Sequence, residues 1–285
     1  MGSMVWRRSG RMCCQQQQQH QYKRVMSSSS SSSVQKEEVL KFSNMASSWW
    51  DAKSNPLLFM NATRLKFITN QIIGTSTKNK SKNNYRLLDG IKALDVGCGG
   101  GVLSESLSRL GATVTAIDPS TEIVEMAKQH STSSSTIQYC GGMSIEDLDP
   151  ESNKFDLICI LEVLEHSSTP QLLIDKATQL LHPNGGTLII STINRTLKSY
   201  ALAIVGAEYI VGALPPGTHN WNQFLTPQEV LQMMPPHYQQ TNISGMIPTH
   251  PPLLSSWKLH PHDTDVNWIA SYQYKPPSTS SSQQS

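Results

Sequence analysis

A glycine-rich turn behind a predicted strand is the feature that most constrains the fold of this 285-residue chain. Residues 93–97 read as a strand and lead into Cys98-Gly99-Gly100-Gly101. Leu103, Leu107 and Leu110 follow with the spacing of one helix face. A strand, a tight glycine turn and a helix, in this order, form the first unit of a Rossmann-like sheet, which binds ligands at the carboxyl ends of its strands. The turn therefore predicts an α/β fold with a ligand site beside it.

The rest of the chain alternates short apolar runs with helical patterns, which favours a mostly parallel sheet with helices on both faces. We expect seven strands, at 93–97, 113–118, 137–141, 155–161 and 187–192 and within 240–248 and 266–274. We expect helices at about 120–130 and 171–181, and two more within 39–73. The sequence therefore predicts a seven-stranded sheet, with two helices ahead of it.

Composition excludes some classes of function. The chain has 23 Lys and Arg against 21 Asp and Glu, so its net charge of +2 gives no sign of a nucleic-acid binder. No run reaches the roughly 18 to 20 apolar residues that a membrane span requires. The cysteines show no CxxC pair or zinc spacing and are expected to be buried thiols in a reducing compartment; they are Cys13, Cys14, Cys98, Cys140 and Cys159.

Both ends of the chain are biased in composition. Residues 1–36 contain no Asp or Glu but include arginines, a glutamine run and a serine run. This pattern is typical of a mitochondrial transit peptide, and the alternative is a low-complexity tail with no targeting role. The organisation we expect is a leader at 1–36, one catalytic domain at 37–275 and a disordered tail at 276–285.

Two aspartates bear on the ligand of the glycine turn. Gly97 and Gly99 let the backbone approach a ligand, but a dinucleotide would place its pyrophosphate there, and the carboxylate of Asp95 would repel it. S-adenosylmethionine carries no phosphate and brings an ammonium and a sulfonium, which an acid favours. Asp118 ends the second strand, where it can hold ribose hydroxyls or simply form the turn before Pro119. Together they favour S-adenosylmethionine over a nicotinamide cofactor.

An acidic and histidine-containing cluster follows the fourth strand. Glu162, Glu165 and His166 are spaced so that one helical turn places all three on one face. Two carboxylates so close repel each other unless a cation lies between them, and such a set suits Mg²⁺. The alternative is a solvated helix start with a negative first turn.

Several segments resemble the ubiquinone-biosynthesis O-methyltransferases, which methylate hydroxyls on polyprenylated aromatic rings. The matching segments are Trp49-Trp50-Asp51, Arg64, 94–101, 111–115, 162–166, 191–195, 205–210 and 217–219. The resemblance implies a Rossmann-like class I S-adenosylmethionine-dependent methyltransferase. It implies that Arg64, Gly97 and Asp118 contact S-adenosylmethionine, that Leu161 lines its site, and that Glu162, Glu165 and His166 hold Mg²⁺.

The same resemblance sets expectations for substrate and location. The substrates would be polyprenylated dihydroxybenzoate and demethylubiquinol. For this reaction His166 is a candidate catalytic residue, and His219 is either a base or substrate ligand or an ordinary exposed loop histidine. An apolar lid near 196–220 could lie on a membrane or be buried over the site. We expect a peripheral protein on the matrix side of the mitochondrial inner membrane, within a multi-subunit complex. The alternatives are a methyltransferase of the same fold with another substrate and a non-catalytic scaffold subunit.

Overall fold

The computed structural model describes residues 32–46, 49–51, 55, 57–75, 86–132, 136–183, 185–204, 220–250 and 253–276. His219, Cys13, Cys14 and most of the expected lid fall outside these residues, as do nearly all of the leader and the tail.

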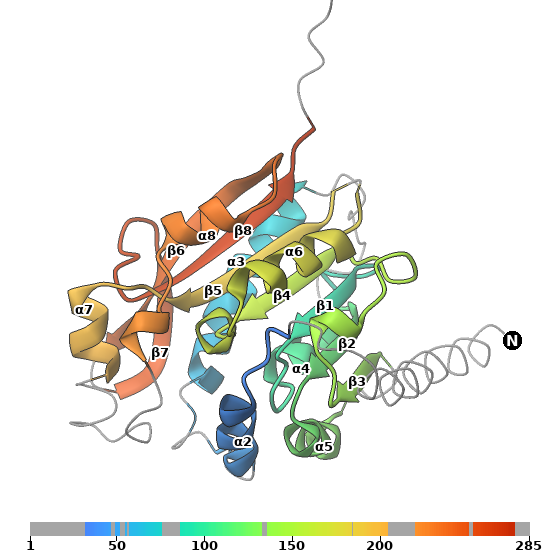
Figure 1. The fold of residues 1–285 in the computed structure, drawn as a ribbon, viewed down its shortest axis with the longest axis horizontal. Coiled ribbons are helices and arrows are strands. Elements are labelled where there is room, and N and C mark those ends of the chain that lie inside the picture. The colour runs from blue at the N-terminus through green and yellow to red at the C-terminus, as the bar shows by residue number, and fades with distance from the viewer. Residues whose placement is uncertain are drawn as a thin grey trace, which may run out of the picture.

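One eight-stranded sheet organises the chain (Figure 1), with the order β3-β2-β1-β4-β5-β8-β6-β7. Its strands are β1 Lys92–Val96, β2 Thr113–Asp118, β3 Ile137–Gly141, β4 Leu157–Leu161, β5 Thr187–Ile193, β6 Tyr238–His250, β7 Leu253–His260 and β8 Asn267–Tyr274. Strands β1 to β5 pair in parallel, whereas β8 runs antiparallel between β5 and β6. The mostly parallel sheet is confirmed, and the edge strand β7, which the sequence analysis missed, makes eight strands where seven were expected.

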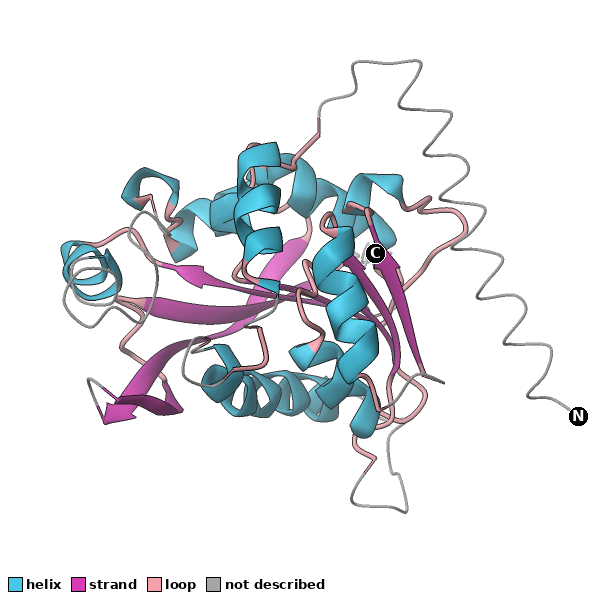
Figure 2. Ribbon diagram, turned by 90° about the horizontal axis from the view of Figure 1, so that it is seen from below, coloured by secondary structure: helices cyan, strands magenta, loops and turns pink. Residues whose placement is uncertain are grey.

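The central strands are buried on both faces, which explains their continuous apolar runs. All five residues of β4 are buried, and they alternate between two hydrophobic clusters on opposite sides of the sheet. Ile158 and Ile160 face the cluster completed by α6 (Pro170–Leu180) and α8 (Pro227–Met233). Leu157 and Cys159 face the cluster completed by α3 (Leu57–Thr75), α4 (Val102–Arg109) and α5 (Thr121–His130). Figure 2 shows the sheet between these helical layers, as predicted.

The helices are α2 Lys36–Asn44, α3 Leu57–Thr75, α4 Val102–Arg109, α5 Thr121–His130, α6 Pro170–Leu180, α7 Leu197–Ser199 and α8 Pro227–Met233. The local sequence determines where several of these helices begin. The Ser120 hydroxyl accepts a hydrogen bond from the Ile123 N–H and caps α5. Thr226 and Glu229 form a reciprocal capping box at α8, with Pro227 at the first helical position.

The strand order places the site. The chain passes from β1 outward to β2 and β3, then crosses back to β4 on the other side of β1. The carboxyl ends of β1 and β4 therefore lie at the topological switch point, where ligands bind in open α/β sheets.

Two further expectations concern thiols and membranes. Cys98, Cys140 and Cys159 are buried, as predicted, and burial raises the pKa of the Cys98 and Cys159 thiols. Within the described ranges, no helix combines the length and the apolar character that crossing a bilayer requires.

Candidate functional site

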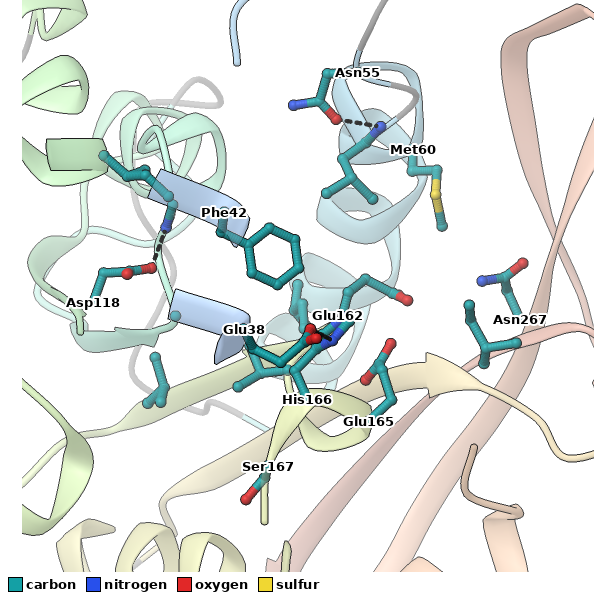
Figure 3. Close-up of a pocket in the computed structure, with 18 of the residues that line it drawn as sticks. Glu38, Phe42, Asn55, Met60, Asp118, Glu162, Glu165, His166, Ser167 and Asn267 are labelled. Atoms are coloured by element: carbon teal, nitrogen blue, oxygen red, sulfur yellow. Dashed lines mark hydrogen bonds and ion pairs between the residues drawn. The ribbon is translucent and has the colours of Figure 1, made fainter. Parts of the chain in front are cut away.

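A cavity of about 640 Å³ opens at the carboxyl edge of the sheet (Figure 3). Its floor comes from the ends of β1, β2 and β4, and its walls come from α2, the start of α3, and residues 198–203. Of the sequence-predicted site residues, it is lined by Gly97, Gly99, Asp118, Leu161, Glu162, Glu165 and His166. The structure thus brings together two groups of predicted residues that lie more than 40 positions apart.

Asp118 closes the glycine turn onto the second strand. Its Oδ2 accepts the Gly99 N–H at 2.9 Å and its Oδ1 accepts the Ser120 N–H at 2.8 Å. Gly99 has φ +51°, a left-handed conformation that glycine adopts without strain. Burial raises the pKa of Asp118 to about 6. The carboxylate is therefore fixed at the cavity wall with acceptor capacity left for a ligand.

Asp95 lies behind this wall instead of in it. The sequence predicts that it faces the cofactor, but it is not among the residues that line the cavity. Its Oδ2 accepts the Ser104 hydroxyl of α4 at 2.6 Å. Burial, opposed by Ser104 and Arg64, raises the pKa of Asp95 to about 7. Asp95 thus acts on the cavity through charge and through the position of α4, not by direct contact.

The raised pKa of Asp95 predicts a pH-dependent effect on stability. The folded protein binds this proton more tightly than the unfolded chain, so its stabilising contribution is present below about pH 4 and is lost as the pH rises to about 7. Asp95→Asn keeps an acceptor for Ser104 without the charge. It should raise the free energy of unfolding more at pH 8 than at pH 5, by about 2 kcal/mol, in denaturant titrations without cofactor. An equal effect at both pH values would contradict this reasoning.

Residues 32–46 and 49–50 form a strap over the cavity. The Ser33 N–H donates to Glu146 Oε1 at 2.9 Å, and the Ser33 carbonyl accepts the Ser168 N–H at 2.9 Å. Helix α2 then crosses the opening (Figure 3) and places Val39 and Phe42 against it. The strap includes residues 32–36, which the expected leader contained.

The far end of the strap rests on the glycine turn. The Trp49 ring covers Gly99 and Gly100 so closely that a Cβ on either would lie within 3 Å of it. The Trp50 Nε1–H donates to the Gly100 carbonyl at 3.0 Å, and its ring stacks on His130 at 5.3 Å. Glycine is therefore required in this turn to leave room for the Trp49 ring, in addition to any ligand.

The acidic cluster does not form the expected helical face. Glu162 has φ +55°, and only 164–166 form a 3₁₀ turn. This left-handed step turns Glu162 toward α3, where its Oε1 accepts the Ser191 hydroxyl at 2.7 Å and lies 3.3 Å from Arg64 Nη2. Glu165 accepts the Thr192 hydroxyl at 2.7 Å. Burial and the Glu162 charge raise the pKa of Glu165 to about 7.

In the part of the chain that the structure describes, no three His, Cys, Asp or Glu side chains are arranged to hold a metal ion. Glu162, Glu165 and His166 are of the types that suit Mg²⁺ and line one cavity, but in this structure they bond to Ser191, Thr192 and Glu38.

Arg64, which the sequence predicts to contact the cofactor, is not among the residues that line the cavity. Its side chain is 7% exposed and its Nη2 pairs with Glu162, whereas Nε makes no hydrogen bond in the structure. A buried guanidinium with a donor left over can bind an additional anion.

Glu38 and Phe42 are cavity residues that the sequence analysis missed. Glu38 Oε2 lies 2.6 Å from His166 Nδ1, and the Phe42 ring packs edge-on against His166 with centroids 4.9 Å apart. No local motif marks these two residues, because their partner lies 128 positions away from Glu38.

Comparisons with known proteins agree with this architecture. Residues 94–190 match a family model described as a methyltransferase domain. Two solved structures have TM-scores of 0.53 and 0.54: a magnesium protoporphyrin IX methyltransferase from Synechocystis with 18% identity, covering 76% of this chain and 84% of the other, and a methyltransferase from Thermotoga maritima with 16% identity, covering 84% and 99%. They share the fold.

Curated relatives are much closer in sequence. A ubiquinone biosynthesis O-methyltransferase from Azorhizobium caulinodans is 38% identical over 81% of this chain and 90% of its own length. A mitochondrial protein of the same name from Arabidopsis thaliana is 40% identical over 82% of this chain and 73% of its own. With these relatives, the methyltransferase domain and the cavity at the switch point, the chain belongs to the ubiquinone biosynthesis O-methyltransferase family, whose members are S-adenosylmethionine-dependent enzymes.

Proposed function

We propose that this protein methylates ring hydroxyls of polyprenylated dihydroxybenzoate and demethylubiquinol. The observation that carries the proposal is the single cavity that joins the glycine turn to the acidic and histidine residues. Apolar side chains line the same cavity, including Met60, Ile193 and Met246. A methyl donor at one end and an aromatic acceptor with an apolar tail at the other would fit this arrangement.

The donor would lie along the floor of the cavity. Asp118 would hold the ribose hydroxyls, while Gly97, Gly99 and Leu161 would line the path of the methionine part. Arg64, whose Nε has no hydrogen-bond partner, would bind its carboxylate, and Asp95 would balance charge behind the loop. When bound, S-adenosylmethionine supplies an electrophilic methyl group on a sulfonium that leaves without assistance.

The chain's own task is to place the acceptor hydroxyl and receive its proton. Alignment alone can contribute roughly 7–11 kcal/mol. His166 lines the cavity and is our candidate for holding the hydroxyl, with Glu165 beside it. Glu162, Glu165 and His166 would hold a Mg²⁺ ion, which would make a catechol hydroxyl more acidic. His219 lies outside the described residues and stays a prediction.

One assay tests the reaction and the metal separately. The full chain is incubated with labelled S-adenosylmethionine and a short-chain prenyl dihydroxybenzoate, with and without EDTA. Label transfer supports the activity. Loss of transfer in EDTA with recovery in Mg²⁺ supports the metal role, whereas transfer unaffected by EDTA would remove that role and keep the enzyme. No transfer by folded protein that binds the donor would overturn the proposed acceptor.

We further propose that the lid touches a membrane. In its described part, Leu197, Tyr200 and Leu202 are exposed by 83%, 48% and 55%, although Leu202 also lines the cavity. Apolar side chains exposed beside a cavity entrance would give a prenylated acceptor a path from a bilayer.

Making this surface polar should weaken membrane binding. Replacing Leu197, Tyr200 and Leu202 with serine removes apolar area that would enter the bilayer, so liposome flotation should show at least about tenfold weaker binding. Ile73→Ser with Tyr274→Ser is the matched control, because these side chains are also exposed but lie elsewhere. Equal flotation of all three proteins would favour a lid that only covers the site.

For location, we propose the matrix side of the mitochondrial inner membrane and a complex with other proteins of the pathway. The acid-free leader and the mitochondrial relative from Arabidopsis thaliana support the organelle. Because Ser33 and Val34 contact the domain, we place transit-peptide cleavage before Ser32 instead of at residue 36.

Truncations test the strap. A chain that begins at Ser32 should bind S-adenosylmethionine like the full chain. A chain that begins at Met45 lacks α2 and one wall of the cavity, so its affinity should fall at least about tenfold, which is about 1.4 kcal/mol. Calorimetry measures the affinity of each chain for S-adenosylmethionine, and circular dichroism checks that each chain is folded. Equal binding by the two chains would show that the strap is not part of the donor site.

A further inference from the structure

Asn267, the first residue of β8, places a buried amide in the wall of the cavity. The residue is 9% exposed and lines the cavity. Its side chain makes no hydrogen bond within the part of the chain that the structure describes. Because buried polar groups are nearly always paired, an amide that faces a cavity without a partner indicates that a ligand supplies the missing group.

The position of Asn267 assigns it to the acceptor and not to the methyl donor. Figure 3 shows Asn267 and Asp118 at opposite ends of the pocket, with Glu165 between them in this view. Because Asp118 would hold the ribose of S-adenosylmethionine, the ring to be methylated would occupy the end beside Asn267. The residues paired with Asn267 in the sheet, Ile193 and Met246, also line the cavity, but their side chains are apolar.

The backbone that carries this amide is fixed on both sides. Asn267 pairs with β5 on one side and with β6 on the other. Just ahead of it, the Asn194 N–H donates to the Val266 carbonyl at 2.7 Å, and Asn194 Nδ2 donates to the Thr264 carbonyl at 2.9 Å. A side chain on such a rigid strand end can orient a ligand with little loss of conformational freedom.

A charged donor near this end of the cavity is already occupied. Lys198 also lines the cavity, but its Nζ donates to Asp263 at 3.0 Å and to Asp265 at 3.2 Å. The amide of Asn267 carries two N–H donors and no charge. An oxygen substituent of the acceptor ring would therefore find its donor at Asn267.

We propose that Asn267 is a specificity-determining residue, whose NH₂ group donates to an oxygen substituent of the acceptor ring other than the hydroxyl that is methylated. Two adjacent hydroxyls present almost the same group to a methyl donor. A further contact on the ring then determines which of them meets the methyl group. The inference rests on the proposed function, because it assumes an acceptor ring with adjacent hydroxyls.

The test uses the full chain, labelled S-adenosylmethionine and a short-chain prenyl dihydroxybenzoate, and chromatography separates the two monomethylated isomers. Asn267→Leu keeps nearly the same volume without polar atoms, and Asn267→Asp keeps the shape but replaces the NH₂ donors with an acceptor oxygen. Both variants should lower the ratio of the major to the minor isomer at least about tenfold. They should lower kcat/KM by a similar factor, since the ring oxygen loses its donor.

Gln273→Leu is the matched control. Gln273 is an amide of the same strand that donates to Thr187 at 2.8 Å and does not line the cavity. This variant should keep the isomer ratio of the wild type. In N267L and N267D the Kd for S-adenosylmethionine should stay within about twofold, which separates a lost acceptor contact from a disturbed fold. If N267L does not fold, N267D alone decides.

A prenyl catechol without the carboxyl group identifies the oxygen that the amide binds. If Asn267 binds the carboxylate, the wild type should lose its selectivity with this acceptor and match N267L. If Asn267 binds the second hydroxyl, N267L should lose as much selectivity with the catechol as with the benzoate. Both results support the contact, and they distinguish its two sources.

Two results would overturn the inference: a wild-type isomer ratio in N267L and N267D with the benzoate, or the same shift of the ratio in Q273L. In either case the wild type still transfers label. Failure of the proposed function would look different, because the wild type would then transfer label to neither acceptor, and the inference would fail with it.

Discussion

Replacing Asp118 with alanine should weaken S-adenosylmethionine binding by about 3 kcal/mol or more, which is at least about a hundredfold. The change removes a carboxylate that would accept two ribose hydroxyls. It also leaves the Gly99 and Ser120 N–H groups without their acceptor, so the glycine turn loses its fixed shape. Isothermal titration calorimetry of the full chain measures the loss.

Two control variants show whether the loss of binding is specific to the Asp118 carboxylate. Glu122→Ala removes an acidic side chain that lies four positions away on α5 and does not line the cavity, and it should bind normally. Asp118→Asn keeps one acceptor oxygen and should fall between the wild type and alanine. If D118A bound the donor as tightly as the wild type, the assignment of this carboxylate to the ribose would be wrong.

The largest loss of stability is expected from Gly245→Ala. Gly245 lies in β6 between β7 and β8, paired with His260 and Trp268. A Cβ there would overlap the Asp263 carbonyl oxygen and lie 2.5 Å from its carbon. Because both atoms belong to the backbone, no rotamer change relieves the collision. The cost should exceed about 3 kcal/mol, the upper end of ordinary overpacking.

At about 2–4 °C for each kcal/mol, the melting temperature should fall by roughly 10 °C. Gly90→Ala is the control, because Gly90 has φ +79° but nothing within 4 Å of the added Cβ. Its free energy of unfolding should fall by only about 1–2 kcal/mol, the cost of a left-handed backbone for a residue with a Cβ. Equal melting temperatures for the two variants would show that the turn at Asp263 yields easily. That turn also carries Asp263 and Asp265, which bind Lys198 of α7, so the position of α7 should change as well.

Strands with strong local patterns were predictable from the sequence. The bounds of β2 and β3 agree with the prediction at both ends, since apolar runs there stop at polar or glycine residues. Strand β7 was missed because its residues 253–260 contain serine and lysine and lie at the sheet edge, where the apolar pattern is weak. Helix α8 was also missed, although the Thr226–Glu229 capping box could have located its start.

The candidate site was predictable where residues adjoin strand ends. The glycine turn, Asp118 and the Glu162–His166 segment each follow a strand, so parallel pairing brings them together. The predicted conformation of the acidic cluster was wrong, because the prediction from spacing assumed a helix, whereas Glu162 adopts a positive φ. Glu38 could not be predicted as a cavity residue, since its contact with His166 depends on a fold that joins residues 128 positions apart.

The strap also has a consequence for how the chain is made. Ser33 and Glu38 leave the ribosome early, but their partners Glu146, His166 and Ser167 are 113 to 134 positions further along. Contacts at such separations form only after the intervening chain is present, and closing such long loops slows folding. In a nascent chain, the strap therefore cannot close over the cavity before residue 167 has left the ribosome. Until then, the apolar side of α2 remains a candidate surface for chaperones.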